Sequence, residues 1–313
     1  MTRSPAGLAD YGLLASLGVM WGGSFMLINL AVVDFPPATL TVIRLLVAAV
    51  IIFAVAASYS EKIKFRARTV WLIILAGFFG NALPFSMISW GQVKVDASLA
   101  AILMGIMPIT TFFLAHFLTR DERLTARKLV GGFIGLTGLV ILVGPAVLLR
   151  LGDDGVRQLA ILAAAVSYSI NAILTKQLLD LPRRAAVAWV LLAGALVMVP
   201  VAVLADNPQD LSVGLVSGIA LLTLGVFPTA VATLVMFSVL HRQGASFFGQ
   251  VNFIVPVFGI IWAAIILGEQ PALSAYVALG FILAGIWVAR GSGQIAPMQP
   301  AAGSALPREK GSR

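Results

Sequence analysis

The sequence predicts an all-α integral membrane protein whose ten transmembrane helices form two inverted five-helix repeats. Three observations lead to this prediction. Of the 313 residues, 60% are hydrophobic and only 11% are charged, whereas about a quarter of the residues are charged in soluble proteins. The apolar residues gather into runs of roughly 20, the length that a helix needs to cross the hydrocarbon. One of these runs, with its flanking residues, recurs in the second half of the chain.

The apolar runs are separated by short polar connections rich in charge, proline and glycine. We expect spans at about 12–32, 38–58, 69–90, 97–118, 127–149, 156–179, 186–205, 213–239, 245–267 and 272–289. Because the connections are short, successive helices should be antiparallel neighbours. The chain then divides into an N-terminal segment, two repeats and a Gly/Ala/Pro-rich tail that is expected to be disordered. These parts are 1–11, 12–149, 150–290 and 291–313.

Basic residues predict the orientation, because Lys and Arg in short loops stay on the cytoplasmic side. With the N-terminus inside, most of the 21 Lys and Arg residues fall in cytoplasmic segments, while Lys94, Arg150 and Arg157 fall outside. Both termini are therefore expected in the cytoplasm, in a multi-pass protein of a bacterial-type inner membrane. The same bias explains the net charge of +8 without a nucleic-acid partner.

The repeated stretches begin at Ala97 and Ala245, each followed by Ser, with Pro108 and Pro256 at the same distance downstream. Further pairs at this spacing are Gly77/Gly225, Phe79/Phe227 and Gly132/Gly280. Each half holds an odd number of spans, so the second half should cross the membrane in the opposite sense. Many secondary transporters are built from such inverted repeats.

Four features stand in a recognisable order: Trp21–Phe25 (Trp-Gly-Gly-Ser-Phe), Arg44, the stretches Pro108–Glu122 and Pro256–Glu269, and the glycine-rich spans that follow. In this order they resemble EamA-type members of the drug/metabolite transporter superfamily, ten-helix class. The resemblance implies a central cavity lined by spans 1, 3, 4, 6, 8 and 9, with spans 5 and 10 peripheral. It also implies export of small metabolites, with amino acids well represented. Tyr168 and its flanking serines depart from a Trp-Ala pair common in the family, which leaves open how span 6 faces the cavity.

Polar residues in lipid are costly and normally face protein or a water-filled cavity. The candidates for substrate binding combine amides, hydroxyls, aromatic rings and pliable methionines: Trp21, Ser24, Asn81, Phe85, Met104, Met107, Tyr168, Asn171, Phe248 and Asn252. Amides both donate and accept hydrogen bonds, and methionine adapts to varied shapes. Such a set would suit a zwitterionic or amide-bearing molecule with an apolar part, most simply a neutral or aromatic amino acid or a related metabolite. Alternatively, each polar group bonds a neighbouring helix, and each aromatic ring belongs to the core.

Pro108 and Pro256 each remove a helix hydrogen bond and could act as kinks or hinges, although packing alone would also explain them. Arg44 lies inside a span, roughly 9 Å from its outer end at 1.5 Å per residue. It could pair with a substrate carboxylate, but we favour snorkelling to the outer interface or capping of neighbouring carbonyls. Glu122 and Glu269 fall at helix ends, where we expect them to be solvated or paired with bases rather than to act as gates.

Several kinds of chemistry lack the residues they need. The absence of cysteine and a total of two histidines exclude disulfides and Cys- or His-rich metal sites, and no cofactor is expected. Without a P-loop, ATP is not the direct energy source. No Asp or Glu lies deep within a predicted span, so we expect a facilitative carrier or unconventional coupling rather than a carboxylate proton relay.

Alternatives remain beside the exporter interpretation. Within transporters, the chain could be an importer or exchanger of another metabolite or drug. An intramembrane enzyme, such as a lipid-modifying transferase, would need paired carboxylates, a His cluster or an activated nucleophile in the spans, and none is visible, so no enzyme is expected. A channel would need a filter sequence, and none is seen.

The expected partners are a small-molecule substrate and the bilayer. The glycines of span 127–149 favour packing within one bundle over dimerisation, so we expect a monomer.

Overall fold

The computed structural model describes residues 6–118, 125–143, 153–178, 180–208, 211–243, 248 and 251–290, and some side chains within these ranges are not described. The regular structure of these residues is helical throughout. In chain order the helices are α1 (Leu8–Ala31), α2 (Pro37–Ser58), α3 (Ala67–Gly77), η1 (Phe78–Ala82), α4 (Leu83–Gln92), α5 (Ala97–Met104), α6 (Met107–Leu118), α7 (Ala126–Val143), α9 (Asp153–Lys176), α10 (Arg183–Val201), η2 (Ala202–Asp206), α11 (Leu215–Leu224), η4 (Gly225–Val231), α12 (Ala232–Gln243), α14 (Val251–Leu267) and α15 (Leu273–Arg290). The tail 291–313 and the predicted boundary between the repeats lie outside the described residues.

These helices have the length and composition of membrane spans. Six stretches are long and apolar enough to cross a bilayer: Leu8–Ala31, Pro37–Ser58, Ala67–Gln92, Gly155–Thr175, Arg183–Asp206 and Leu215–Val239. Shorter apolar helices occupy Ala97–Thr111, Leu129–Gly138, Ile254–Leu267 and Leu273–Val288. The protein is therefore a multi-pass helical membrane protein.

Among the described residues, three predicted spans contain a turn of π-helix, η1, η2 and η4. Proline explains the two that lie in mid-span, η1 and η4. A proline has no amide hydrogen and its ring clashes with the carbonyl four residues earlier. Pro84 is the second residue after the end of η1, and Pro228 lies inside η4. The carbonyl that Pro228 cannot use, that of Leu224, instead accepts a hydrogen bond of 2.8 Å from Thr229 Oγ1. Turns of this kind frequently occur at functional sites.

The span predicted at 97–118 is also discontinuous, and the interruption lies just before Pro108. Helix α5 ends at Met104, and α6 begins at Met107. Pro108 therefore stands in the first turn of a new helix, where a missing amide hydrogen costs little, and it does not kink a continuous span. Pro256, in contrast, lies inside α14.

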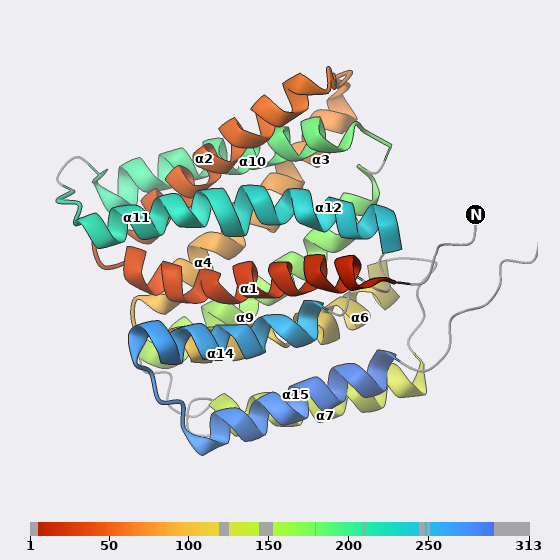
Figure 1. Ribbon diagram of the computed structural model, residues 1–313, viewed down its shortest axis with the longest axis vertical. Coiled ribbons are helices and arrows are strands. Elements are labelled where there is room, and N and C mark those ends of the chain that lie inside the picture. The colour runs from red at the N-terminus through yellow and green to blue at the C-terminus, as the bar shows by residue number, and fades with distance from the viewer. Residues whose placement is uncertain are drawn as a thin grey trace, which may run out of the picture.

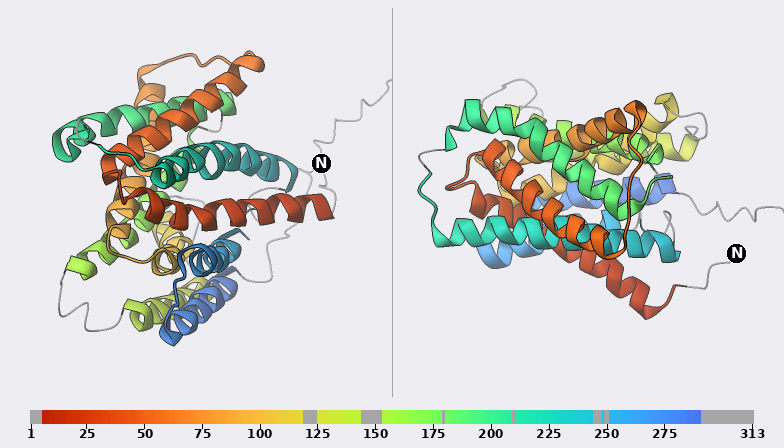
Figure 2. Two further views of the ribbon diagram at one scale, coloured as in Figure 1. Left: turned by 60° about the vertical axis from the view of Figure 1, so that its left-hand side comes forward. Right: turned by 90° about the horizontal axis from the view of Figure 1, so that it is seen from above.

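The bundle is layered, with its helices running between two ends (Figures 1 and 2). Helices α2 and α10 pack together at one edge, and α7 and α15 pack together at the other (Figure 1). Between these edges, α1 packs on α14 and α4 packs on α9. The pair formed by α7 and α15 is peripheral, as the family resemblance implies for spans 5 and 10.

Small residues allow the closest helix approaches near the interrupted spans. A Cβ at Gly77 of α3 would lie 2.7 Å from the backbone nitrogen of Gly194 and from the carbonyl oxygen of Val190, both in α10. A Cβ at Gly225, at the start of η4, would lie 2.7 Å from Val47 of α2. Glycine at these two positions therefore lets α3 contact the backbone of α10 and lets the backbone of η4 contact the Val47 side chain of α2.

Candidate functional site

A cavity of about 320 Å³ lies between α3–η1, α9, α10 and α12. Its polar lining residues are Asn81, Asn171, Thr175, Arg183 and Thr233. The rest of its wall is mostly apolar: Ala76, Gly80, Leu178, Ala186, Val187, Val190, Leu191, Met236 and Phe237. A few polar groups in a largely apolar concavity are typical of a small-molecule site.

Local structure positions the two cavity amides. Asn81 lies in the π-turn η1, and among the described residues nothing bonds its side chain, so its donors and acceptor remain available to a ligand. Asn171 of α9 packs against Gly80, where a Cβ would lie 2.5 Å from Asn171 Nδ2. Thr175 Oγ1 donates weakly to Asn171 Oδ1 at 3.3 Å. Glycine at position 80 therefore leaves the room that the Asn171 amide occupies beside η1.

A larger cavity of about 730 Å³ adjoins the first one and shares Arg183 and Phe237 with it. Its other lining residues are Leu13, Val55, Tyr59, Glu61, Arg184, Leu234, Ser238 and Arg242. They come from the start of α1, the end of α2 and the segment after it, the start of α10, and α12. The end of the bundle where α1 begins (Figure 1) is here called the N-terminal end. The exposed Arg183 side chain stands where the two cavities meet. Together they form a path from the N-terminal end to the amides.

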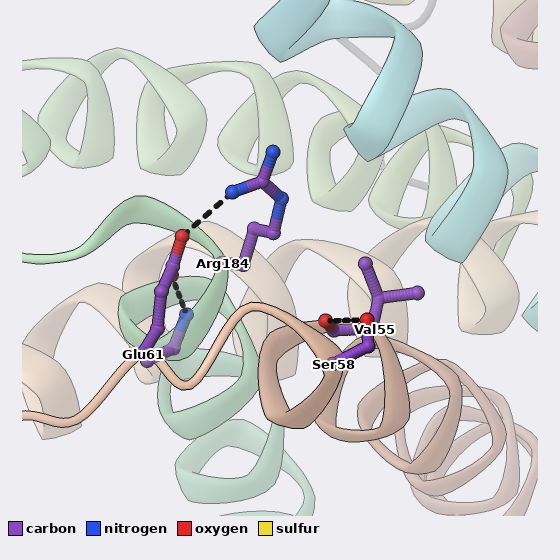
Figure 3. A network of polar contacts seen from close by, with 5 residues as sticks. Val55, Ser58, Glu61 and Arg184 are labelled. Carbon is purple, nitrogen blue, oxygen red and sulfur yellow. Dashed lines mark hydrogen bonds and ion pairs between the residues drawn. The ribbon is translucent and has the colours of Figure 1, made fainter.

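Ion pairs and helix caps order the rim of this path. Arg184 Nη1 pairs with Glu61 Oε1 at 2.7 Å, and Glu61 Oε2 accepts the backbone amide of Ala185 at 3.0 Å (Figure 3). The Arg184 guanidinium also stacks on the Tyr59 ring at 3.8 Å. Burial opposes the ionisation of Glu61, but the bonds from Ala185 and Arg184 outweigh it and lower the pKa of this carboxyl. Glu61 therefore caps the first turn of α10 as a carboxylate.

The opposite end of the bundle is fastened by bonds from side chains to backbone. Asp206 Oδ2 accepts the amide of Thr39 at 2.6 Å, at the start of α2, and Asp34 Oδ2 accepts the amide of Gly214 at 2.8 Å, before α11. Gln92 is buried and donates to the carbonyl oxygen of Phe25 at 2.7 Å. The cavities at the N-terminal end therefore have a closed bundle behind them.

Glu269 takes part in this closure, which corrects the expectation that it would be solvated or paired with a base. Its two carboxylate oxygens accept the backbone amides of Ala97 and Ser98 at 2.8 and 3.0 Å. A carboxylate there satisfies unpaired amides in the first turn of α5. The corresponding Glu122 lies outside the described residues.

Arg44 lies outside the lining of the cavity, and its position contradicts the snorkelling prediction. Its side chain is only 4% exposed. Its Nε donates to Thr229 Oγ1 at 2.8 Å, and its guanidinium carbon lies 3.8 Å from the centre of the Phe85 ring. Phe85 in turn packs edge-on against Tyr168, with centroids 6.4 Å apart. Arg44 is thus held inside the bundle and does not reach the interface.

The predicted site residues separate into three groups. Asn81 and Asn171 line the smaller cavity, and Phe85 with Tyr168 forms the layer behind it. Trp21 and Phe248 belong to one apolar cluster and Met104 and Met107 to another, while Ser24 bonds within α1. The Asn252 side chain lies outside the described residues.

Trp21, Phe248, Ser24, Met104 and Met107 have structural contacts instead. Trp21 packs edge-on against Phe248, with ring centroids 6.0 Å apart, and its Nε1 donates to the Pro228 carbonyl oxygen at 3.1 Å. Ser24 Oγ donates to the Trp21 carbonyl oxygen within α1 at 2.6 Å. Met104 and Met107 pack in an apolar cluster around Ile106, Ile109 and Ala165. None of these five predicted residues lines either described cavity.

The cavity also differs from the one that the resemblance implies, because α10 supplies much of its wall. The prediction missed Arg183 and Thr233 in particular. Arg183 was counted only as an orientation signal in a loop. Thr229 and Thr233 stand four residues apart in an apolar run, which places them on one helix face, and this spacing is the signal that would have identified them.

A multi-pass helical bundle with a mainly apolar cavity reached from one end has the architecture of a membrane transporter. The chain belongs to the EamA-like transporter family, whose family model matches residues 10–144 and again residues 157–291. It is 23% identical over 276 residues to the uncharacterized transporter YoaV of Bacillus subtilis, covering 88% of this chain and 94% of that one. It is 26% identical over 270 residues to a probable terminal-alkyne amino-acid exporter of Streptantibioticus cattleyicolor, covering 86% and 89%. A solved crystal structure shares the fold with a TM-score of 0.66 and 20% identity, covering 91% of this chain and 97% of that one.

Proposed function

We propose that this protein exports small metabolites, most fittingly neutral or aromatic amino acids, as a facilitative carrier that works by alternating access. The cavity with Asn81 and Asn171 carries the proposal, because it offers two amides for polar recognition and an apolar wall for a side chain. Its volume of about 320 Å³ suits a molecule of amino-acid size. The similarity to a probable amino-acid exporter supports the same substrate class.

Alternating access requires two halves that can exchange roles, and we propose ten spans in two inverted five-span repeats. The two separate matches to the family model support this arrangement. The π-turns η1 and η4, on spans 3 and 8, occupy corresponding places in the two halves. The helix caps are also reciprocal, because Glu61 caps α10 from the connection after α2, and Asp206 caps α2 from the connection after α10.

The proposed orientation decides which side of the membrane the two cavities face. Basic residues retained inside would place the N-terminal end, with its two cavities, in the cytoplasm of a bacterial-type inner membrane. The structure would then represent an inward-open state, poised to receive a cytoplasmic substrate. Among the described residues, Asp10 is the one buried carboxylate. It lies near this end of α1, and its Oδ1 pairs with Arg242 Nε at 2.6 Å. This position favours a structural role over a proton relay, which supports transport without obligatory coupling.

Counterflow into liposomes tests the proposal. Purified protein should exchange labelled leucine or phenylalanine with internal unlabelled substrate in the absence of an imposed proton gradient. Asn81→Ala should lower this flux about tenfold, because a hydrogen bond to a charged ligand group contributes about 1.5–3 kcal/mol. Asn29→Ala, the same change in α1 outside the cavity lining, should leave it unchanged. Strict dependence on a proton gradient would refute the facilitative mechanism, and large unitary currents in electrical recordings would indicate a channel.

A further inference from the structure

Arg44 is a buried cation without an ionic partner among the described residues. Its side chain is 4% exposed, and no described carboxylate lies within ion-pair distance of it. Charges removed from water are normally paired, because the lost hydration is otherwise not compensated. A charge retained in this setting points to a counter-ion that is not part of the described chain.

The contacts of Arg44 leave one edge of its guanidinium group available. Thr229 Oγ1 accepts the Nε hydrogen at 2.8 Å, and its own proton is directed to the Leu224 carbonyl. The Phe85 ring covers one face of the group at 3.8 Å. Neither contact uses the in-plane N–H groups of Nη1 and Nη2, for which no acceptor is found in the described residues. Two such N–H groups side by side match the oxygens of a carboxylate.

The neighbours of Arg44 lie about one helical turn from the residues that line the smaller cavity. Phe85, Tyr168 and Thr229 each stand three or four residues, about one helical turn or 6 Å, from a cavity-lining residue. The corresponding lining residues are Asn81, Asn171 and Thr233. In all three helices, the neighbour of Arg44 lies farther from the N-terminal end than the corresponding lining residue does. Arg44 and its neighbours therefore form the layer that a molecule in the cavity would meet next.

We infer that Arg44 is the receptor for the carboxylate of the transported molecule, with Thr229 fixing the guanidinium and Phe85 covering it. This inference rests on the proposed function and specifies its substrate class as carboxylate-bearing small molecules. The bound carboxylate neutralises the buried charge. Asn81 and Asn171 remain for the amino group, and the apolar wall of α10 remains for the side chain.

The test compares phenylalanine with phenylalaninamide, which lacks the carboxylate, as stabilising ligands of the purified protein and as inhibitors of leucine counterflow. For the wild type, phenylalanine should act at a concentration at least about tenfold lower than the amide, the ratio expected for a charge-assisted hydrogen bond. Arg44→Met should reduce this ratio to about twofold or less. Arg44→Lys, which keeps the charge but loses the paired N–H groups, should give an intermediate ratio. A purely structural Arg44 would change stability and leave the ratio unaltered.

The outcomes separate the two proposals. A wild-type protein that moves no amino acid at all would overturn the proposed function. A wild type that transports phenylalanine but treats it and its amide alike would overturn the carboxylate receptor alone, as would a ratio that survives Arg44→Met. If Arg44→Met does not fold, the ratio measured for Arg44→Lys and Thr229→Val tests the inference instead. Thr229→Val should lower the ratio severalfold by releasing Nε, and unchanged ratios in both variants would refute the inference.

Discussion

Two carboxylates near helix ends, Glu61 and Asp96, have pKa values shifted in opposite directions. Glu61 accepts bonds from Ala185 and Arg184, so its pKa is lowered despite partial burial. Asp96 stands beside α5, but the helix amides there are already bonded by Glu269. Partial loss of hydration and the charge of Glu269 raise the pKa of Asp96. One carboxylate therefore stabilises the fold when ionised, and the other destabilises it.

These settings predict opposite responses to pH. Glu61 contributes stability above its ordinary pKa of 4.5, and this contribution is lost as the pH falls through its lower folded value. Glu61→Gln should therefore cost about 1 kcal/mol at pH 7, as expected for a lost cap, with the difference shrinking below pH 4.5. Asp96→Asn should raise the melting temperature at pH 7 and have little effect near pH 4. Tryptophan fluorescence during thermal unfolding of each variant measures both effects, and a destabilised Asp96→Asn at pH 7 would contradict the assignment.

At the scale of the helices, proline and glycine shape the site. Prolines after η1 and within η4 interrupt the regular hydrogen bonding, and the interrupted turns carry Asn81 and Thr229. Glycines beside these turns let the neighbouring helices approach, as Gly77 does with α10. The cavity therefore depends on close helix contacts as well as on its polar residues.

Filling one of these contacts should loosen the bundle. Gly77→Val places side-chain atoms against the backbone of α10, which should lower the free energy of unfolding by about 1–3 kcal/mol, the usual cost of overpacking. Gly280→Val is the matched control, because a Cβ at Gly280 would have no neighbour within 4 Å. Thermal melts of the two variants in the same detergent compare them directly. Equal melting temperatures would show that the close contact of α3 and α10 is not important for stability.

For the whole molecule, the arrangement of bonds at the two ends determines where the cavity is accessible. The opposite end is held by Asp206, Asp34, Glu269 and Gln92, whereas the N-terminal end has the adjoining cavities. In an alternating-access carrier these conditions would exchange. Because the chain contains no cysteine, single cysteines can report accessibility in an otherwise native protein.

Thr175→Cys, at the cavity wall, should react with a membrane-impermeant maleimide in inside-out vesicles and much more slowly in intact cells. Phenylalanine should slow the reaction by occupying the site. Ser89→Cys is the control, because Ser89 is fully buried toward the opposite end and should be protected in the inside-out vesicles. Rapid labelling of Thr175→Cys from outside intact cells would invert the proposed topology.

The sequence by itself determined the membrane class, the approximate extent of the helices and the family. Hydrophobic run length and the scarcity of charge are local properties, and they are decisive because lipid allows few alternatives to a helix. The sequence also singled out Asn81 and Asn171, which line the smaller cavity, because amides are rare within apolar runs.

The tertiary structure alone decided which of these residues come together. Trp21 and Asn81 are equally unusual within apolar runs, yet Trp21 bonds the Pro228 carbonyl while Asn81 lines the cavity. Arg44 looked able to reach the interface because its side chain is long, but a hydroxyl on η4 and a ring on α4 hold it inside. Such contacts depend on helix rotation and on backbone approach at glycines. Both are set by the packing of distant segments, so the pattern within one span could not reveal them.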